Sequence, residues 1–297
     1  MIAINNIIEY KLKIADLYFE ITSFPDNYTE QTLSSYSVEE IPHGESFYKV
    51  NCTITTDSLE EPPGEKLTIR QETNWYKVSD GVYNQSMYDA ENDCICANVL
   101  FDNISKTASV VVKDMKGIYG VDTEVFLYNL LDRLFRLIVV FNGGFVFHAS
   151  SVAYKERGIA FSAQSGVGKS THTGLWLENK EGTYIINDDA PVLRFTDGKW
   201  YIYGSPWAGT TGINANVKLP FEALVFLERN SDNVITDCPV SSGIKRVFEA
   251  IMHPVSDEIT DILFYLVSHL FTDSRVCILG CNISEDAVNT VEKYLFK

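Results

Sequence analysis

A stretch with the sequence AQSGVGKS, beginning at Ala163, has the residue types and spacing of a loop that binds phosphate. It matches the pattern G-x-x-x-x-G-K-[S/T] except at its first position, where alanine replaces glycine. Gly166 and Gly168 allow backbone N–H groups to turn inward around phosphate oxygens. Lys169 then reaches the β- and γ-phosphates, and Ser170 offers a hydroxyl ligand to Mg²⁺. We expect the loop to bind a nucleotide with Mg²⁺, and Ala163 to be tolerated if its φ is negative.

Two carboxylates, Asp188 and Asp189, follow the apolar segment TYIIN shortly after this loop. An apolar strand that ends in carboxylates delivers them to the C-terminal edge of a sheet, where open α/β sheets bind their ligands. An isolated pair of this kind is more often a turn, because aspartate is a favoured turn residue. The short interval after Lys169 leaves room for one helix and one turn, and this proximity favours a functional role for the pair.

His148 lies in the segment FVFHASS, upstream of the loop. A histidine among phenylalanine and valine residues is, by itself, more often a core residue than a catalytic one. If its strand is the neighbour of TYIINDD, the imidazole could hydrogen-bond a carboxylate and adjust its pKa toward general-base use. His172, in the first helical turn after the loop, is expected to face either the nucleotide or solvent.

Alternating strands and helices in the C-terminal part must position these residues. Apolar residues at helical spacing predict a helix over 122–141, ended by the sequence NGG. A hairpin is expected at FVFHASSVAY-KERG-GIAFS, followed by the loop, a helix and the strand TYIINDD. Further on we predict a second hairpin at VLRF-TDGK-WYIY, a strand at EALVFLE and mainly helix over 244–270. A last strand, RVCIL, precedes a helix capped by Ser284.

The N-terminal part has a different pattern. Short β-type runs such as LYFEIT, YKVNCTITT and ASVVVKD are separated by turn clusters such as EEPPGE. We therefore predict two domains, a β-rich N-terminal domain over 1–120 and an α/β domain over 121–297.

The charge balance excludes polyanion partners. The chain has 40 acidic and 24 basic residues and a formal net charge of −16, so its field repels nucleic acid and anionic membranes. The segment FLYNLLDRLFRLIVVF is too polar to cross a bilayer, and the start MIAINNIIEYKLK lacks the features of a signal peptide. We expect a cytoplasmic protein without nucleic-acid or membrane partners. The oligomeric state is left open between a monomer and a homo-oligomer.

The segments HASSVAY, GIAFSAQSGVGKSTHTGLW and INDD together resemble the C-terminal catalytic domain of the HPr kinase/phosphorylase family, which shares a nucleotide-binding fold with phosphoenolpyruvate carboxykinases. The resemblance covers residues 145 to about 195 well, the later residues less specifically and the N-terminal domain hardly at all. It implies an α/β kinase domain with the phosphoenolpyruvate carboxykinase-like P-loop fold and a mixed sheet. It also implies transfer of the γ-phosphoryl group of ATP to a hydroxyl, most naturally a serine of a protein or peptide.

The same resemblance implies roles for individual residues. One aspartate acts as the base toward the acceptor and the other holds Mg²⁺; on this basis Asp188 is the base, and Asp189 is a metal ligand together with Ser170. The catalytic residues are then Asp188, His148 and Lys169. The residues expected to contact the nucleotide are Ser165, Gly166, Val167, Gly168, Lys169, Ser170 and Thr171.

Two departures from the family pattern bear on the substrate. Thr171 stands where the family has an acidic residue, and the segment AGTTGINAN lacks the arginine of the family's glycine-rich signature. Both weigh against HPr as the substrate and against the reverse phosphorolysis reaction. A small-molecule kinase and a non-catalytic ATP-binding regulator therefore stay open as alternatives. A GTPase is disfavoured because the chain has no N-K-x-D guanine motif.

Overall fold

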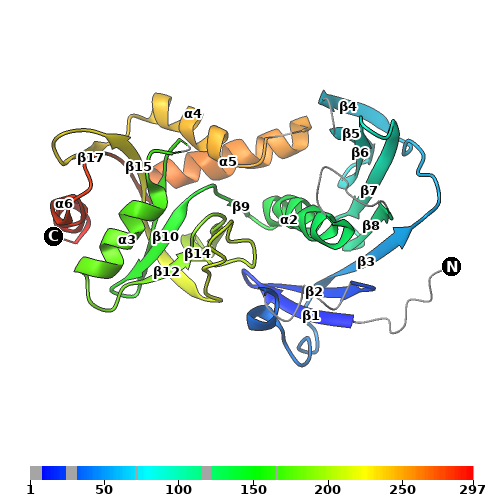
Figure 1. The fold of residues 1–297 in the computed structure, drawn as a ribbon, viewed down its shortest axis with the longest axis horizontal. Helices are drawn as coiled ribbons and strands as arrows, with labels where there is room; N and C mark the ends of the chain where they lie inside the picture. Colours follow the sequence, from blue (N-terminus) through cyan, green and yellow to red (C-terminus); the bar gives the residue numbers. More distant parts are fainter. Residues whose placement is uncertain are drawn as a thin grey trace. The chain divides into compact units, whose positions relative to one another are not determined.

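The computed structural model describes residues 9–24, 32–70, 73–114, 122–164, 166–253 and 255–296. Its contacts divide the chain into two compact units, Met1–Ile138 and Val139–Lys297 (Figure 1). Each unit is built around its own large sheet. The first unit is β-rich, and the second alternates strands and helices.

The first unit contains an eight-stranded sheet with the strand order β1-β2-β3-β8-β7-β6-β5-β4. Most neighbours are antiparallel, and β3 is parallel to both β2 and β8. A short 3₁₀ helix, Ser34–Tyr36, follows β2. The strands are β1 Glu9–Ile14, β2 Leu17–Thr22, β3 Phe47–Thr55, β4 Glu65–Arg70, β5 Thr73–Ser79, β6 Val82–Asp89, β7 Cys94–Asp102 and β8 Thr107–Lys113.

Helix α2, Thr123–Phe141, confirms the helix predicted over 122–141. It packs on the first sheet, where the rings of Phe135 and Phe19 lie 5.9 Å apart between centroids. Most of the helix therefore belongs to the first unit. The boundary predicted at residue 120 instead separates the helix from the sheet on which it packs. Gly143, with a φ of 74°, follows the helix in the left-handed conformation that commonly ends helices.

The second unit has a nine-stranded mixed sheet. One path runs β12-β10-β11-β15-β14-β13-β9, and β17 pairs with β15 on one side and with β16 on the other. β11 is antiparallel to β10 and parallel to β15. The strands are β9 Gly144–Val146, β10 Ser150–Tyr154, β11 Arg157–Ser162, β12 Tyr184–Asn187, β13 Val192–Thr196, β14 Lys199–Tyr203, β15 Lys218–Arg229, β16 Val234–Asp237 and β17 Arg275–Cys281.

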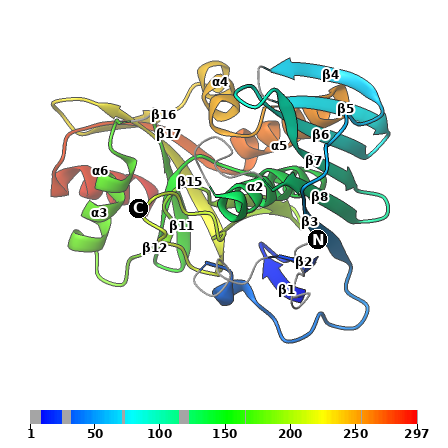
Figure 2. The same cartoon turned by 45° about the vertical axis from the view of Figure 1, so that its right-hand side comes forward.

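Helices cover both faces of the second sheet (Figures 1 and 2). They are α3 Lys169–Asn179, α4 Val240–Ala250, α5 Asp257–Asp273 and α6 Glu285–Leu295. Alternate residues of β15 face opposite sides, as the strand period requires. Val225 joins a core with Trp176 of α3 and Val288 of α6, whereas the ring of Phe226 lies 5.5 Å from the guanidinium of Arg246 on α4.

Several predicted elements differ in detail. The region 244–270 contains parts of two helices, α4 and α5, with a break after Ala250. Ser284 occupies the N-cap position of α6, but its hydroxyl donates to Asn282 instead of capping the helix. No helix in the described ranges combines the length and apolar character that a membrane crossing requires.

Candidate functional site

The predicted phosphate loop connects a buried strand to a helix. β11 ends at Ser162 and α3 begins at Lys169, so strand, loop and helix occur in the predicted order. Gly166 and Gly168 have φ values of 79° and 118°, which glycine adopts without steric cost. Ala163 has no positive φ. A methyl group is therefore tolerated at the one position that departs from the motif.

The first turn of α3 begins with backbone N–H groups that face away from the helix. Ser170 and Thr171 are exposed, and a Cβ at Gly166 would meet no atom within 4 Å. The first N–H groups of a helix have no intrahelical acceptor, and Gly168 at the N-cap provides no side chain to satisfy them. Such a helix end attracts anions. Ser165, also predicted to contact the nucleotide, lies outside the described residues.

Asp188 is buried, with 7% of its surface exposed. Its strand is the antiparallel neighbour of β10, with Ser151 opposite Asn187, so Ser150 and Asp188 lie across from each other. The hydroxyl of Ser150 donates to Asp188 Oδ1 at 2.6 Å and lies 2.9 Å from Thr173 Oγ1 of α3. Asp188 is thereby tied to the helix that follows the loop. The sequence analysis assigned no role to Ser150. The two adjacent serines after His148 are the feature that could have drawn attention to it.

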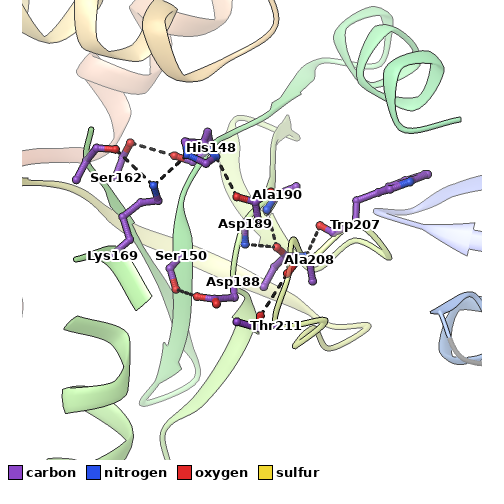
Figure 3. Close-up of polar contacts among 12 residues, drawn as sticks. His148, Ser150, Ser162, Lys169, Asp188, Asp189, Ala190, Trp207, Ala208 and Thr211 are labelled. Atoms are coloured by element: carbon purple, nitrogen blue, oxygen red, sulfur yellow. Dashed lines mark hydrogen bonds and ion pairs between the residues drawn. The ribbon is translucent and has the colours of Figure 1, made fainter. Parts of the chain in front are cut away.

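His148 joins Lys169 to Asp189 (Figure 3). Its Nε2 lies 3.0 Å from Lys169 Nζ, and its Nδ1 lies 3.0 Å from Asp189 Oδ1. Because an ammonium group can only donate, Nε2 is the acceptor and Nδ1 carries the proton that is donated to Asp189. The cation of the loop, a neutral imidazole and a carboxylate therefore form one hydrogen-bonded chain.

His148 was expected to contact a carboxylate, and the one it contacts is Asp189, not Asp188, which was assigned as the base. In a continuous strand, His148, Ser150 and the residue opposite Ser150 would share one face of the sheet. The chain instead bends at His148, between β9 and β10. The bend is held by a hydrogen bond of 2.7 Å from the His148 N–H to the carbonyl of Ala250. The imidazole consequently contacts Asp189, and Asp188 contacts Ser150.

Asn187, fully buried before the two aspartates, holds their turn in place. Its side-chain oxygen accepts from the backbone N–H groups of Asp189 and Ala190, at 2.9 and 2.6 Å. Its amide donates to the carbonyls of Ser205 and Trp207, at 2.9 and 3.2 Å. The carboxylates are thus fixed to the segment that follows β14. Sequence reasoning also missed this residue.

The glycine-rich segment 208–216 lies against the same turn. The N–H of Asp188 donates to the carbonyl of Ile213 at 3.2 Å. Gly209 has a φ of 61°, and a Cβ there would lie 3.0 Å from the Cβ of Asp189. The segment therefore meets the carboxylates with backbone atoms. It has no Arg or Lys side chain that could pair with them.

Lys169 is partly desolvated. Burial lowers its pKa below the ordinary value, and the charges of Asp189 and Asp188 oppose this shift. Its ammonium group also lies 3.5 Å from the Ala163 carbonyl. A cation that is shielded from water and held on the loop gains more from a phosphate than an exposed lysine does.

His172 does not face solvent, although it borders the cavity beside α3. It is 3% exposed and lies edge-on to Phe161, with 4.6 Å between ring centroids. The indole N–H of Trp176 donates to its Nε2 at 3.3 Å. Burial lowers the pKa of His172 to about 4. His172 is a neutral core residue.

His172 should make folding stability depend on pH. Its pKa is lower in the folded than in the unfolded chain, so its contribution is complete above about pH 6.5 and is lost as the pH falls toward 4. Between pH 7 and pH 5, we expect wild type to lose about 2 kcal/mol more unfolding free energy than the His172→Gln variant. Urea unfolding followed by tryptophan fluorescence measures this; equal losses in both proteins would contradict it.

Among the described residues, two cavities adjoin the loop, and Val167 and Arg229 line both. The first, about 460 Å³, is bordered by Thr171 and Leu175 of the α3 region and by residues 281–283. The second, about 810 Å³, has His148, Ala163 and Gln164 on one side and α4 on the other. The loop thus lies between a space beside its helix and a space beside His148.

The residues present fit a nucleotide with Mg²⁺. The two left-handed glycines and the open helix end suit phosphate oxygens, and Lys169 supplies a cation. Ser170 is exposed and the side chain of Asp189 is 39% exposed, so both can be reached by a metal ion. In the described part of the chain, no three His, Cys, Asp or Glu side chains form a metal site. Mg²⁺ is commonly held by one or two carboxylates together with substrate phosphates.

No protein family model matches this chain, and no curated protein sequence matches it. Among solved structures, it is similar to the HPr(Ser) kinase/phosphatase from Coxiella burnetii, with 11% sequence identity and a TM-score of 0.23. The match covers 51% of this chain and 99% of that one. A similarity at this TM-score supports no conclusion about function.

Proposed function

We propose that this chain is an ATP- and Mg²⁺-dependent kinase that transfers the γ-phosphoryl group to a hydroxyl. The observation that carries the proposal is the hydrogen-bonded chain Lys169–His148–Asp189, which joins the phosphate loop to one of the two carboxylates. We further propose the phosphoenolpyruvate carboxykinase-like P-loop fold for the second unit. Its mixed sheet and its strand-loop-helix order support this.

In this proposal the loop holds the triphosphate. Gly166 and Gly168 shape the backbone, Val167 lies between them, and Lys169 neutralises charge on the transferred group. Phosphoryl transfer needs little covalent participation by the protein, so positioning and charge neutralisation supply most of the rate. Ser170 and Asp189 would hold Mg²⁺, which when bound withdraws charge from the phosphate oxygens.

The transfer requires a proton acceptor, for which we propose Asp188. The acceptor oxygen forms a bond to the γ-phosphorus, the bond from that phosphorus to the bridging oxygen breaks, and ADP leaves with the electron pair. The hydroxyl proton passes to the carboxylate. His148 is then a positioning residue, because it contacts Asp189 and Lys169. One observation favours the opposite assignment, with Asp189 as the base and Asp188 as the metal ligand: Asp189 is the more exposed of the two and contacts His148.

His148→Ala tests whether this arrangement supports turnover. We expect turnover to fall about 10²-fold with nearly unchanged ATP affinity, because Lys169 and Asp189 lose the ring that holds them. Steady-state kinetics and calorimetry measure the two quantities. His43→Ala is a matched control, since His43 is exposed in the first unit. Equal turnover in the two variants would contradict a positioning role for His148.

The direct test of the activity uses labelled ATP and lysate from the protein's own source. A protein band or small molecule labelled by wild type but not by Asp188→Asn would support the kinase. Tight ATP binding without any labelled product would favour the regulator, consistent with the absence of a basic residue in segment 208–216.

A further inference from the structure

The cavity of about 810 Å³ places one face of α4 opposite His148. Five residues of α4 line it, at the spacing i, i+3, i+4, i+7 and i+8 that defines one helix face: Ser242, Lys245, Arg246, Glu249 and Ala250. The opposite face of the helix buries Gly243 and Val247. α4 is therefore held by its apolar side and presents a polar side to the cavity.

Three cations from two elements meet in this cavity, in a chain with a net charge of −16. Lys245 is 80% exposed, and its ammonium lies 3.8 Å from Glu249. Arg246 pairs with Glu228 and lies over the ring of Phe226. Arg229 donates to the carbonyl of Gly166 in the loop. Lys245 is the cation held most loosely, so it is the freest to pair with a ligand.

The cations are close to the proposed site of transfer. The last residue of α4, Ala250, accepts the hydrogen bond from the His148 N–H at 2.7 Å. At a rise of about 1.5 Å per residue, Arg246 and Lys245 lie roughly 6 to 8 Å back along the helix from that point. A ligand of a few bonds' length therefore spans the space from His148 to these side chains.

We propose that this cavity binds the phosphoryl acceptor and selects a small molecule whose hydroxyl is accompanied by a carboxylate or phosphate group. The proposal rests on the kinase function above and names its acceptor class. The volume lies within the range of roughly 300–1,000 Å³ that is usual for small-molecule sites. The hydroxyl lies beside His148, whose other ring nitrogen contacts Asp189, and the anionic group pairs with Lys245 and Arg246. The bonds made and broken are those of the transfer already described.

The experiment compares acceptors that differ in charge. Glycerol is the neutral probe, glycerate, tartrate and glycerol 3-phosphate are the anionic probes, and a neutral and an acidic serine peptide represent protein acceptors. Each is titrated into protein saturated with Mg-ADP and then assayed for ADP release from Mg-ATP. We expect binding and turnover with at least one anionic probe, weakened about 10-fold or more in Lys245→Glu. Lys199→Glu, an equal charge change outside both cavities, should have no effect.

The outcomes separate the acceptor proposal from the kinase proposal. If ATP binds but no anionic probe binds or reacts, or if only glycerol or a peptide reacts, the acceptor class is overturned and nucleotide binding stands. Equal use of an anionic probe by Lys245→Glu and Lys199→Glu also overturns it. So does an ATP affinity that falls in Lys245→Glu, since the cation would then serve the nucleotide. If ATP does not bind to wild type, the kinase proposal itself fails.

Discussion

Asp188→Asn is expected to lower phosphoryl transfer by about 10²- to 10⁴-fold while leaving ATP affinity nearly unchanged. The amide keeps the shape of the carboxylate but cannot accept the proton of the acceptor hydroxyl. Its carbonyl oxygen can still accept the hydrogen bond from Ser150, so the buried turn should survive the substitution. Single-turnover kinetics with labelled ATP, together with calorimetry, separate the chemical step from binding.

Asp189→Asn is the matched control for this prediction. It changes the neighbouring carboxylate by the same atoms, and we expect it to raise the Mg²⁺ concentration needed for activity. If Asp189→Asn removes transfer and Asp188→Asn raises the Mg²⁺ requirement, the two roles are exchanged and the kinase proposal stands. If both variants turn over as fast as wild type, neither carboxylate acts as the base.

Lys169→Ala is expected to weaken Mg-ATP binding by about 100-fold, the upper range for a lost charge-assisted hydrogen bond. Lys169 is the only side-chain cation in the stretch AQSGVGKS, and its partial burial leaves it without full hydration. Calorimetry of the folded variant measures the effect, with Lys199→Ala as the control for loss of one positive charge. An unchanged ATP affinity in Lys169→Ala would contradict the proposal that this loop binds the nucleotide.

Local patterns predicted several elements because each pattern has a short-range cause. Helical spacing of apolar residues placed α2, and the glycine–lysine pattern placed the turn between β11 and α3 of the second unit. The adjacency of the His148 segment and β12 was a hypothesis, and the pairing of β10 with β12 confirms it. The contact-based division at Ile138 falls later than the predicted boundary at residue 120, because the sequence does not show which sheet α2 packs against.

The fine geometry of the site depends on contacts that sequence spacing does not encode. The bend at His148 is fixed by the carbonyl of Ala250, about a hundred residues later, so the sequence did not reveal which carboxylate the imidazole contacts. Asn187 has a role only because the segment after β14 returns to it. His172 is buried because Phe161 and Trp176 enclose it, which a position in the first helical turn does not reveal.

A crystal structure with a non-hydrolysable ATP analogue and Mg²⁺ tests the central claim most directly. The account predicts a triphosphate along residues 163–170, with Lys169 at its β- and γ-phosphates and Mg²⁺ on Ser170 and Asp189. His148 should then keep its contact with Asp189 while Lys169 turns to the phosphates. An analogue bound elsewhere, or phosphates that lie away from Lys169 and both aspartates, would contradict the account.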